Sequence, residues 1–215
     1  MYTDSVTLSV FLIDLDDTLY PAASGLWPAI RERICKYMLE RLGLPKDQVH
    51  DLRRRLYMEY GTTLRGLQAT MQVDVDDYLA YVHDLPIDDF LSPDPELRRT
   101  LMAYPQRKYI FTNADRAHAR RVMARLGVED CFEGVIDVHD LEPYCKPMRE
   151  AFAIAFQRAG EADPTRCLLA DDTPHNLAAA RDLGMFVVQV GDQPTNPDSF
   201  PRIARLADLP RVLPP

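Results

Sequence analysis

Cysteine is scarce in this chain, and its cysteines are not arranged as zinc ligands or as a disulfide framework. The 215 residues include four cysteines, with no CxxC pair and no cysteine–histidine cluster at metal-ligand spacing. They are Cys35, Cys131, Cys145 and Cys167. The pattern excludes a structural zinc site and a disulfide-stapled scaffold, and it favours a reducing, cytoplasmic location.

A membrane-spanning run and a cationic leader are also missing. The apolar run over residues 8–13 is far shorter than the roughly 20 residues that span a bilayer. Residues 1–5 contain no lysine or arginine, whereas a signal peptide starts with positive charge. We therefore expect no export signal and no membrane partner.

Positively charged residues are fewer than negatively charged ones. The chain has 25 Lys and Arg residues and 33 Asp and Glu residues, which gives a net charge of −8. Proteins that bind nucleic-acid polymers need a basic face, so we do not expect such a partner. Hydrophobic residues make up 47% and charged residues 27% of the chain, which is ordinary for a globular protein and excludes a disordered one. An acidic protein that acts on anionic small molecules must cancel its own charge locally, with a metal or a few placed cations.

Five short runs rich in β-branched and aromatic residues predict the strands of one sheet. They cover residues 8–13, 108–111, 134–138, 167–170 and 185–190. Helical patterns that stop at a glycine separate the later runs, over residues 115–126, 148–159 and 174–183. This alternation predicts an α/β fold, with a parallel sheet covered by helices.

The alternation is interrupted once, after the first strand. No strand-like run occurs between Tyr20 and about Pro95, and helical patterns cover residues 26–42, 46–60 and 76–84. We interpret residues 21–95 as a helical cap, and residues 1–20 and 96–215 as the α/β core. A helix is expected near residues 96–103, and the proline-rich tail over residues 193–215 is expected to be irregular.

Polar side chains follow the predicted strands at the point where each strand ends. They are Asp14 and Asp16 after the first run, Thr112 and Asn113 after the second, Asp171 and Asp172 after the fourth, and Lys146 ahead of the helix that leads to the fourth. Because ligands of a parallel α/β sheet bind beyond the carboxyl ends of its strands, these side chains are expected to meet there. Four carboxylates at one sheet edge repel one another unless a cation joins them, and an all-oxygen ligand set prefers Mg²⁺ over zinc.

Each motif taken alone also fits a structural role. Acidic residues after a strand often cap the next turn or helix, and a lone lysine is commonly a surface residue. The order of the four motifs favours a shared site over these interpretations. We assign Asp17 a structural role, and histidines such as His83 and His118 show no spacing that indicates a site.

These ordered motifs resemble those of the haloacid dehalogenase superfamily of phosphohydrolases. The residues that carry the resemblance are Asp14-Leu15-Asp16-Asp17-Thr18-Leu19, Thr112, Lys146-Pro147 and Asp171-Asp172. The resemblance covers about residues 6–20 and 96–192, and a helical cap inserted after the first motif is also typical of that superfamily. It implies a Rossmann-like parallel sheet core of the haloacid dehalogenase fold, carrying the cap.

The resemblance implies a phosphoric monoester hydrolase that works through an aspartyl-phosphate. The Asp14 carboxylate would attack phosphorus, and Asp16 would protonate the leaving oxygen and later activate water. Thr112 and Asn113 would bind the transferring oxygens. Lys146 would screen Asp14 from the incoming phosphate and stabilise charge in the transition state.

It also implies Mg²⁺ as the cofactor. The ion would be held by the Asp14 carboxylate, the Asp16 carbonyl and Asp172, with Asp171 either a direct ligand or acting through water. If Asp16 is protonated, the charges of the other three carboxylates, of Mg²⁺ and of Lys146 cancel before the substrate binds. A dianionic phosphate is then tolerated.

A closer resemblance is to the pyrimidine 5′-nucleotidase group of that superfamily. It is carried by residues 14–21 with Ser24 and Gly25, by residues 60–67 in the cap, and by residues 111–114, 145–147, 171–173 and 176. It implies UMP and CMP as substrates, with residues 62–67 closing over them; phosphoglycolate or a sugar phosphate is the alternative. Arg65 would contact a phosphate or a base carbonyl, or else hold its loop together.

Other functions fit the motifs less well. A halide-displacing relative would use the same nucleophile but needs neither a second acid nor a divalent metal, so Asp16 argues against it. A signalling receiver domain places its phosphoacceptor after a middle strand, whereas Asp14 follows the first. We expect a small-molecule phosphate ester as the partner, and a monomer or a small homo-oligomer.

Overall fold

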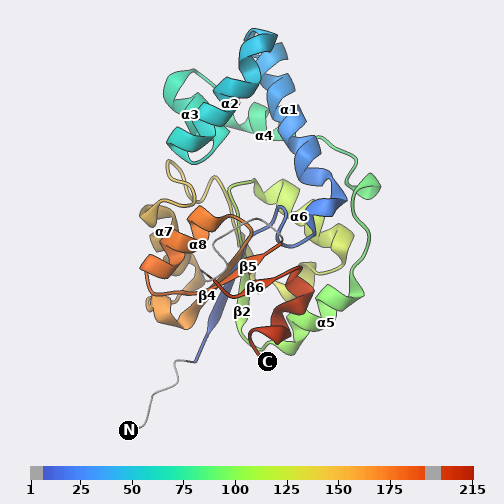
Figure 1. The fold of residues 1–215 in the computed structure, drawn as a ribbon, viewed down its shortest axis with the longest axis vertical. Helices are drawn as coiled ribbons and strands as arrows, with labels where there is room; N and C mark the ends of the chain where they lie inside the picture. The colour runs from blue at the N-terminus through green and yellow to red at the C-terminus, as the bar shows by residue number, and fades with distance from the viewer. Residues whose placement is uncertain (1–6, 192–199) are drawn as a thin grey trace.

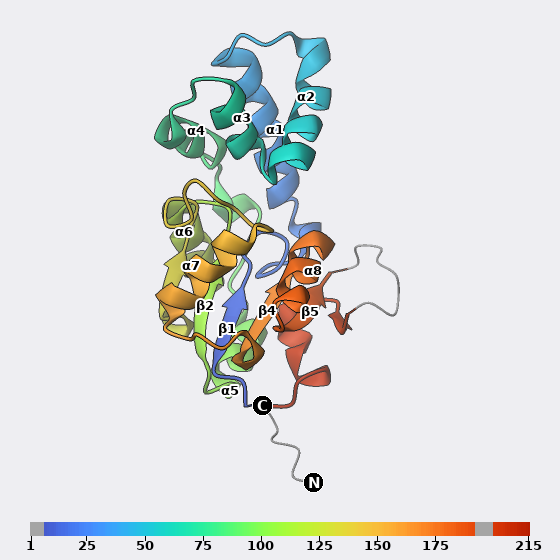
Figure 2. The same cartoon turned by 90° about the vertical axis from the view of Figure 1, so that its left-hand side faces the viewer.

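The computed structural model describes residues 7–191 and 200–215. One part of the molecule is a six-stranded sheet with helices on both faces. The other part consists of four helices that lie beyond one end of the strands (Figure 1, Figure 2). We call these four helices the cap helices and the remainder the core. The α/β fold with helices inserted after the first strand is confirmed.

The sheet contains all five predicted strands and a sixth. They are β1 (Val10–Ile13), β2 (Arg107–Phe111), β3 (Gly134–Ile136), β4 (Cys167–Asp171), β5 (Phe186–Val190) and β6 (Arg202–Ile203). The strands pair in the order β3-β2-β1-β4-β5-β6, and every pair is parallel. This is the order of a doubly wound sheet, in which the ligand crevice lies where the strand order reverses, beyond the carboxyl ends of β1 and β4.

The central strand β1 is buried on both faces. Phe11 and Ile13 join an apolar cluster that includes side chains of the helices on one face, and Val10 and Leu12 join a second cluster on the other face. A strand covered on both sides needs apolar residues at every position, which explains the unbroken run in the sequence. Asp14 is the first polar residue after this run and therefore lies at the sheet edge.

The core helices begin and end within one residue of the predicted positions. They are α5 (Pro95–Ala103), α6 (Arg116–Leu126), α7 (Arg149–Ala159) and α8 (Pro174–Asp182). Gly127 and Gly160 follow α6 and α7 with φ of 74° and 63°, the left-handed conformation that ends a helix at glycine. Among the described residues, no helix is both long and apolar enough to cross a membrane.

Three of the four cap helices match the predicted segments, and one does not. They are α1 (Leu26–Glu40), α2 (Lys46–Tyr60), α3 (Thr63–Thr70) and α4 (Val75–Val82). Residues 62–67, expected to close over the substrate, are the start of α3. Thr62 caps that helix, since its Oγ1 atom accepts the backbone N–H of Arg65 at 3.1 Å. The division of the chain at residues 21–95 stays a prediction.

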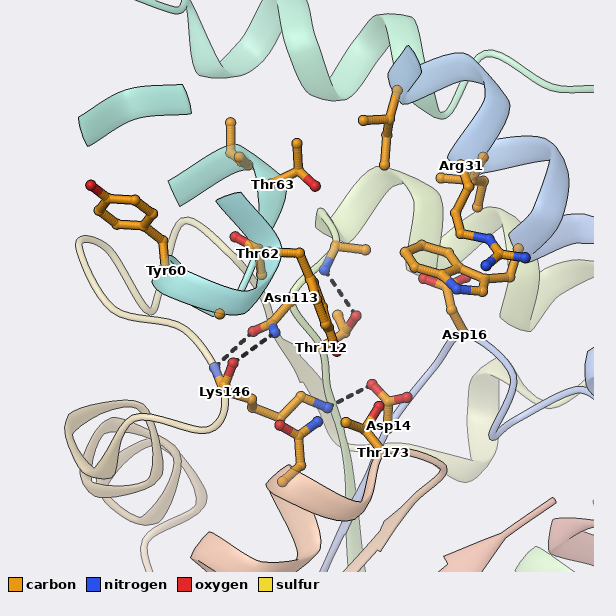
Figure 3. Close-up of a pocket in the computed structure, with 18 of the residues that line it drawn as sticks. Asp14, Asp16, Arg31, Tyr60, Thr62, Thr63, Thr112, Asn113, Lys146 and Thr173 are labelled. Atoms are coloured by element: carbon orange, nitrogen blue, oxygen red, sulfur yellow. Dashed lines mark hydrogen bonds and ion pairs between the residues drawn. The ribbon is translucent and has the colours of Figure 1, made fainter. Parts of the chain in front are cut away.

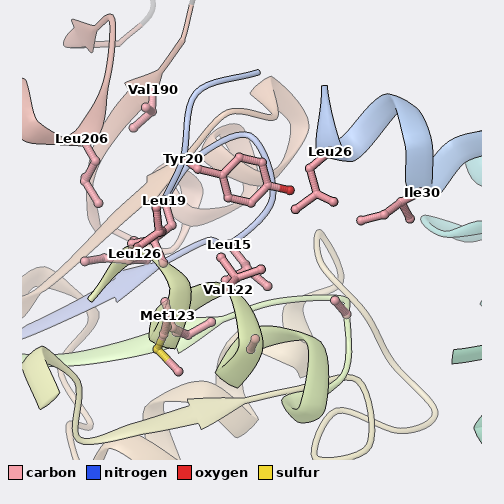
Figure 4. Close-up of a cluster of buried hydrophobic side chains, with 14 of the residues drawn as sticks. Leu15, Leu19, Tyr20, Leu26, Ile30, Val122, Met123, Leu126, Val190 and Leu206 are labelled. Carbon is pink, nitrogen blue, oxygen red and sulfur yellow. The ribbon is translucent and has the colours of Figure 1, made fainter. Parts of the chain in front are cut away.

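The segment that follows β1 joins the two layers. Leu15, Leu19 and Tyr20 are at most 2% exposed and lie between Val122 of α6 and Leu26 of α1 (Figure 4). Burial of each large apolar side chain contributes roughly 1.5–3 kcal/mol. The chain that carries Asp14 and Asp16 is therefore fixed on both sides by packing.

The tail is more regular than the sequence indicates. Of the predicted irregular segment over residues 193–215, residues 193–199 lie outside the described part of the chain. The remainder contains β6 and a 3-10 helix, Leu206–Arg211. Ile203, Leu206 and Leu209 are at most 4% exposed, so a few apolar side chains dock this proline-rich segment on the core.

Candidate active site

Asp14 lies at the carboxyl end of β1, with both carboxylate oxygens held by neighbouring side chains. The Lys146 Nζ atom donates to Oδ1 at 2.6 Å, and the Thr18 hydroxyl donates to Oδ2 at 3.2 Å (Figure 3). Lys146 also donates to Asp171 Oδ2 at 2.8 Å and is 1% exposed. Burial alone would lower the pKa of Lys146, but Asp14 and Asp171 outweigh burial and raise it, so this lysine stays charged.

Asn113 positions Lys146 through its backbone. The Asn113 Oδ1 atom accepts the Lys146 backbone N–H at 2.9 Å, and the Asn113 Nδ2 atom donates to the Lys146 carbonyl at 3.2 Å (Figure 3). Both ends of the amide are thus committed to protein. This amide fastens the loop of the lysine. Its Nδ2 atom carries a second N–H and Asn113 lines the cleft, so the contact of Asn113 with phosphate oxygens stays a prediction.

Thr112 retains the means to contact a phosphate. Its Oγ1 atom accepts the backbone N–H of Ala114 at 3.0 Å, which leaves the hydroxyl proton to be donated. Thr112 is 2% exposed and lines the same cleft as Asp14 and Lys146. The three motifs are therefore brought together as expected.

Three carboxylates meet closely enough to share a metal ion. Oxygens of Asp14, Asp171 and Asp172 all lie within 4.8 Å of one another. Burial raises the pKa of Asp14 well above its usual value, and the two neighbouring carboxylates raise it further, although Lys146 opposes them. Burial and Asp171 likewise raise the pKa of Asp172 to about 7. One lysine does not offset this repulsion, so the donor set fits a hard divalent cation.

Asp171 and Asp172 have different surroundings. Asp171 is fully buried and accepts hydrogen bonds from Lys146 and from Asn176 Nδ2, which lies 3.0 Å from Oδ1. Asp172 is half-buried, accepts a hydrogen bond from the Thr173 hydroxyl and lines the cleft. Asp172 is thus the better placed direct ligand. Asn176 holds Asp171 in place.

Asp16 faces the cleft and is held by two residues that were not expected to contact it. Its Oδ1 atom accepts from the Tyr20 hydroxyl at 2.5 Å and from His118 Nε2 at 2.9 Å. Burial would raise the pKa of Asp16, but His118 and these hydrogen bonds outweigh burial and lower it. Without a metal ion, this arrangement therefore favours the ionised form of Asp16.

Some of these contacts carry a local signal that sequence reasoning missed. Thr18 contacts Asp14 and Tyr20 contacts Asp16, each four residues farther along the chain. A chain that turns after a strand brings positions i and i+4 together, so this spacing indicates both contacts. His118 lies 102 residues from Asp16, and no local spacing reveals it.

The cleft between the core and the cap helices has a volume of about 630 Å³. From the cap, its lining includes Trp27, Arg31, Arg53 and Tyr57. Trp27 and Tyr57 border the cleft, and Tyr57 is 40% exposed. Arg31 reaches from α1 toward Asp16 (Figure 3). The cap thus offers aromatic and cationic side chains to the part of a substrate that projects from the core.

Arg65 does not line the cleft, and the structure corrects its predicted contact with substrate. The side chain is 5% exposed, and its guanidinium donates to the carbonyls of Tyr144 at 3.1 Å and Val138 at 2.8 Å. It also donates to Gln68 at 2.7 Å. These partners occupy the group, so Arg65 ties α3 to the core loop that precedes Lys146, which is the structural alternative considered for it.

Sequence comparison finds relatives of this chain. The model of the haloacid dehalogenase-like hydrolase family matches residues 8–184. Phosphate metabolism protein 8 of Saccharomyces cerevisiae is 30% identical over 190 residues, which cover 82% of this chain and 59% of the yeast protein. Fructose-1-phosphate phosphatase YqaB of Escherichia coli is 32% identical over 79 residues, 37% of this chain and 41% of that protein. The chain thus spans little more than half the length of the yeast relative, and the YqaB match is shorter still.

Solved structures share the fold. A HAD phosphatase from Thermococcus onnurineus superposes with a TM-score of 0.64 at 16% identity, covering 96% of this chain and 97% of that one. L-2-haloacid dehalogenase from Xanthobacter autotrophicus superposes with a TM-score of 0.61 at 18% identity, covering 96% and 98%. At such identities the likeness concerns the fold alone. The family model spans β1 to β4, the cap helices and every motif of the site, and the chain belongs to the haloacid dehalogenase-like hydrolase family.

Proposed function

We propose that the protein is a Mg²⁺-dependent phosphomonoesterase that works through an aspartyl-phosphate on Asp14. The observation that carries the proposal is the contact of 2.6 Å between Lys146 Nζ and Asp14 Oδ1, within a carboxylate cluster that lacks sufficient positive charge. Membership of the hydrolase family supports this class of reaction, and one relative is named as a phosphatase.

In the first step, an Asp14 oxygen attacks phosphorus while the bond between phosphorus and the leaving oxygen breaks. The Lys146 ammonium and the Thr112 hydroxyl stabilise the charge on the transferring oxygens. Asp16 donates a proton to the leaving oxygen, which departs as an alcohol. Because its pKa is low in the free site, Asp16 takes up this proton as the phosphate dianion enters and adds negative charge nearby.

In the second step, Asp16 acts as the base. It accepts a proton from water, the water oxygen attacks phosphorus, and the bond to Asp14 breaks to release phosphate. The hydrogen bonds from Tyr20 and His118 favour the ionised carboxylate that this step requires. The same residue thus serves both steps with opposite protonation states.

The residues present fit a Mg²⁺ ion. Asp14, Asp172 and the Asp16 carbonyl would hold it, while Lys146 and Asn176 keep Asp171 in place beside them. When bound, the ion supplies positive charge that stabilises the transferring phosphoryl group. The carboxylates themselves supply the oxygen ligands that this ion prefers.

For the substrate, we propose a pyrimidine nucleoside 5′-monophosphate such as UMP or CMP. The support is the resemblance of residues 60–67 to the nucleotidase group and the presence of Trp27 and Tyr57 beside the cleft, where a base could stack. A sugar phosphate is a second candidate, favoured by the similarity to fructose-1-phosphate phosphatase. Both substrates are phosphate monoesters and need the same core chemistry.

The site argues against the other functions considered. Halide displacement needs no second acid, whereas Asp16 faces the cleft with its own hydrogen-bonding partners. A receiver domain does not agree with the family match, with the position of Asp14 after the central first strand or with the helices that follow it.

The experiment that tests the proposal is phosphate release from UMP, CMP, AMP, fructose 1-phosphate and phosphoglycolate, with Mg²⁺ and with EDTA. We expect turnover of at least one ester that is lost with EDTA and with the Asp14→Asn variant. Preference for UMP and CMP supports the nucleotide proposal, and preference for a sugar phosphate or phosphoglycolate refutes it while leaving the chemistry intact. No turnover of any ester by the metal-loaded protein contradicts the phosphomonoesterase proposal.

A further inference from the structure

His118 lies in the first turn of α6, and its side chain hydrogen-bonds to Asp16. The two atoms, His118 Nε2 and Asp16 Oδ1, are 2.9 Å apart, and the His118 side chain is 1% exposed. An ionised carboxylate accepts hydrogen bonds only, so the imidazole donates. The side chain thus fixes one oxygen of the residue that transfers protons in the proposed reaction.

The other nitrogen of the same ring indicates what this position serves. His118 Nδ1 is buried and has no hydrogen-bond partner within the described part of the chain. A buried polar atom without a partner destabilises the folded state, and an apolar side chain at this position would avoid that cost. The contact with Asp16 accounts for a histidine here.

A residue from the cap region holds the ring of His118 in its plane. His83, at the carboxyl end of α4, stacks on His118 with ring centroids 4.2 Å apart and an angle of 7° between the rings. His83 Nδ1 lies 2.5 Å from Asp115 Oδ2, while Asp115 Oδ1 accepts the backbone N–H of His118 at 2.8 Å. Arg121 of α6 also donates to the His83 carbonyl at 2.8 Å.

Two layers of the molecule therefore meet beside the acid–base residue. α4 belongs to the cap helices and α6 to the core, and Asp115 connects the two histidines by binding one with each carboxylate oxygen. If α4 shifts relative to α6, the stack and the hydrogen bond to Asp115 change together. The orientation of the His118 ring then changes as well.

We propose that His118 is a positioning residue that orients the Asp16 carboxylate for proton transfer. Through the stacking of His83 on His118, this orientation depends on the position of α4 relative to α6. The proposal rests on the proposed phosphomonoesterase function. It adds a specific consequence, because proton transfer to the leaving oxygen becomes sensitive to His118, which does not line the cleft, and to His83, which lines it and acts through His118.

The test compares two esters that differ in their need for an acid. An alkyl phosphate such as UMP or glycerol phosphate has a poor leaving group, whereas p-nitrophenyl phosphate has a good one that departs without a proton. We measure kcat/KM, which covers the steps up to leaving-group departure. Because a positioned general acid contributes typically 10²–10⁴-fold, we expect His118→Phe to lower kcat/KM about 10–100-fold for the alkyl ester and less than about threefold for p-nitrophenyl phosphate.

Three further variants keep the proposal falsifiable. His118→Gln retains a donor and is expected to regain part of the lost activity. His83→Ala removes the stack and should show the same dependence on leaving group, whereas His83→Phe retains an aromatic face and should show less of it. In the Asp16→Asn background, where the positioned carboxylate is gone, His118→Phe should change kcat/KM less than about twofold.

The outcomes separate this inference from the proposed function. Turnover by the wild-type protein together with an equal loss on both esters, or a loss that persists in the Asp16→Asn background, overturns the positioning role and leaves the phosphomonoesterase in place. Absence of turnover by the wild-type protein overturns the proposed function itself. If His118→Phe fails to fold, His118→Gln and His83→Ala replace it. The ratio of their kcat/KM values for the two esters then supports or overturns the positioning role by the same criterion.

Discussion

The Lys146 ammonium contacts the Asp14 carboxylate at 2.6 Å and is buried with it, so each group depends on the other for its charge. This pair joins the end of the first strand to a loop 132 residues farther along the chain. The relationship fixes the proposed nucleophile at the place in the described sheet where the strand order reverses. The following predictions concern this pair and the residues that support it.

Replacement of Lys146 by methionine retains the volume of the side chain but removes its charge. We expect kcat to fall about a thousandfold, comparable to the loss of a transition-state donor, because the ammonium that contacts Asp14 and would stabilise the transferring oxygens is lost. Breaking a buried ion pair typically costs about 3–5 kcal/mol, so the melting temperature should also fall. Mg²⁺ should restore part of the stability and none of the activity; a variant with near-normal kcat contradicts the role of Lys146.

The affinity for Mg²⁺ should depend on pH, because Asp172 has a pKa of about 7 before the ion binds. Below that pH the carboxyl holds a proton that Mg²⁺ must displace, whereas above it the ligand is already ionised. Titration calorimetry should therefore show the apparent affinity falling with each unit of pH below about 7 and levelling off above it, with proton release on binding near pH 6.

Asp172→Asn supplies the control for the pH measurement. The variant lacks the titrating carboxyl, so its residual affinity should be weaker and should depend less on pH near 7. An affinity of the unaltered protein that is constant between pH 6 and 8 contradicts direct ligation by Asp172.

Arg65→Met should affect stability rather than substrate binding. The guanidinium donates to the carbonyls of Val138 and Tyr144, and its removal leaves these buried or partly buried acceptors without a partner. We expect a loss of about 3 kcal/mol in urea unfolding, with KM changed less than about twofold. Arg54→Met, on the exposed side of α2, is the matched control and should be nearly neutral. A large rise in KM with normal stability would instead support a contact between Arg65 and the substrate.

Gly61 allows the end of α2 to approach the loop of Lys146. Its φ is +83°, and a Cβ there would lie 2.8 Å from Cys145 Sγ and 3.3 Å from the Lys146 carbonyl. Gly61→Ala should therefore displace that loop and lower kcat about tenfold or more, since small misplacements in an active site can cost up to 10²-fold. Gly43→Ala is the control, because Gly43 also has a positive φ but a Cβ there would meet no described atom within 4 Å. Equal kcat for the two variants refutes this role.

Most of the sheet and the site could be predicted from local patterns. β1 could be predicted directly, because a strand buried on both faces is apolar throughout. The ends of α6 and α7 could be predicted from Gly127 and Gly160. The residues after β1, β2 and β4 converge because parallel strands end at one edge. Asp14 and Lys146 lie together for that reason, as expected.

The remaining features depend on tertiary contacts that leave no local signal. Helix α3 has only eight residues and includes Gly66 and two threonines, which have low helix propensity. β6 pairs over two residues, too few for a periodic pattern. The contacts of Arg65 and His118 are with residues more than 70 positions away in the chain. The residue type alone does not indicate such contacts, because an arginine also fits phosphate binding and a histidine also fits a surface position.

The most direct test of the central claim is to look for phosphate on Asp14 during turnover. The protein is quenched in acid while it hydrolyses its preferred ester. It is then reduced with borohydride, which converts an aspartyl-phosphate into homoserine, and peptide mass spectrometry locates this change. The account predicts this change at position 14 of the unaltered protein and no such change in Asp14→Asn. Undiminished turnover by Asp14→Asn, or modification at another carboxylate, would contradict it.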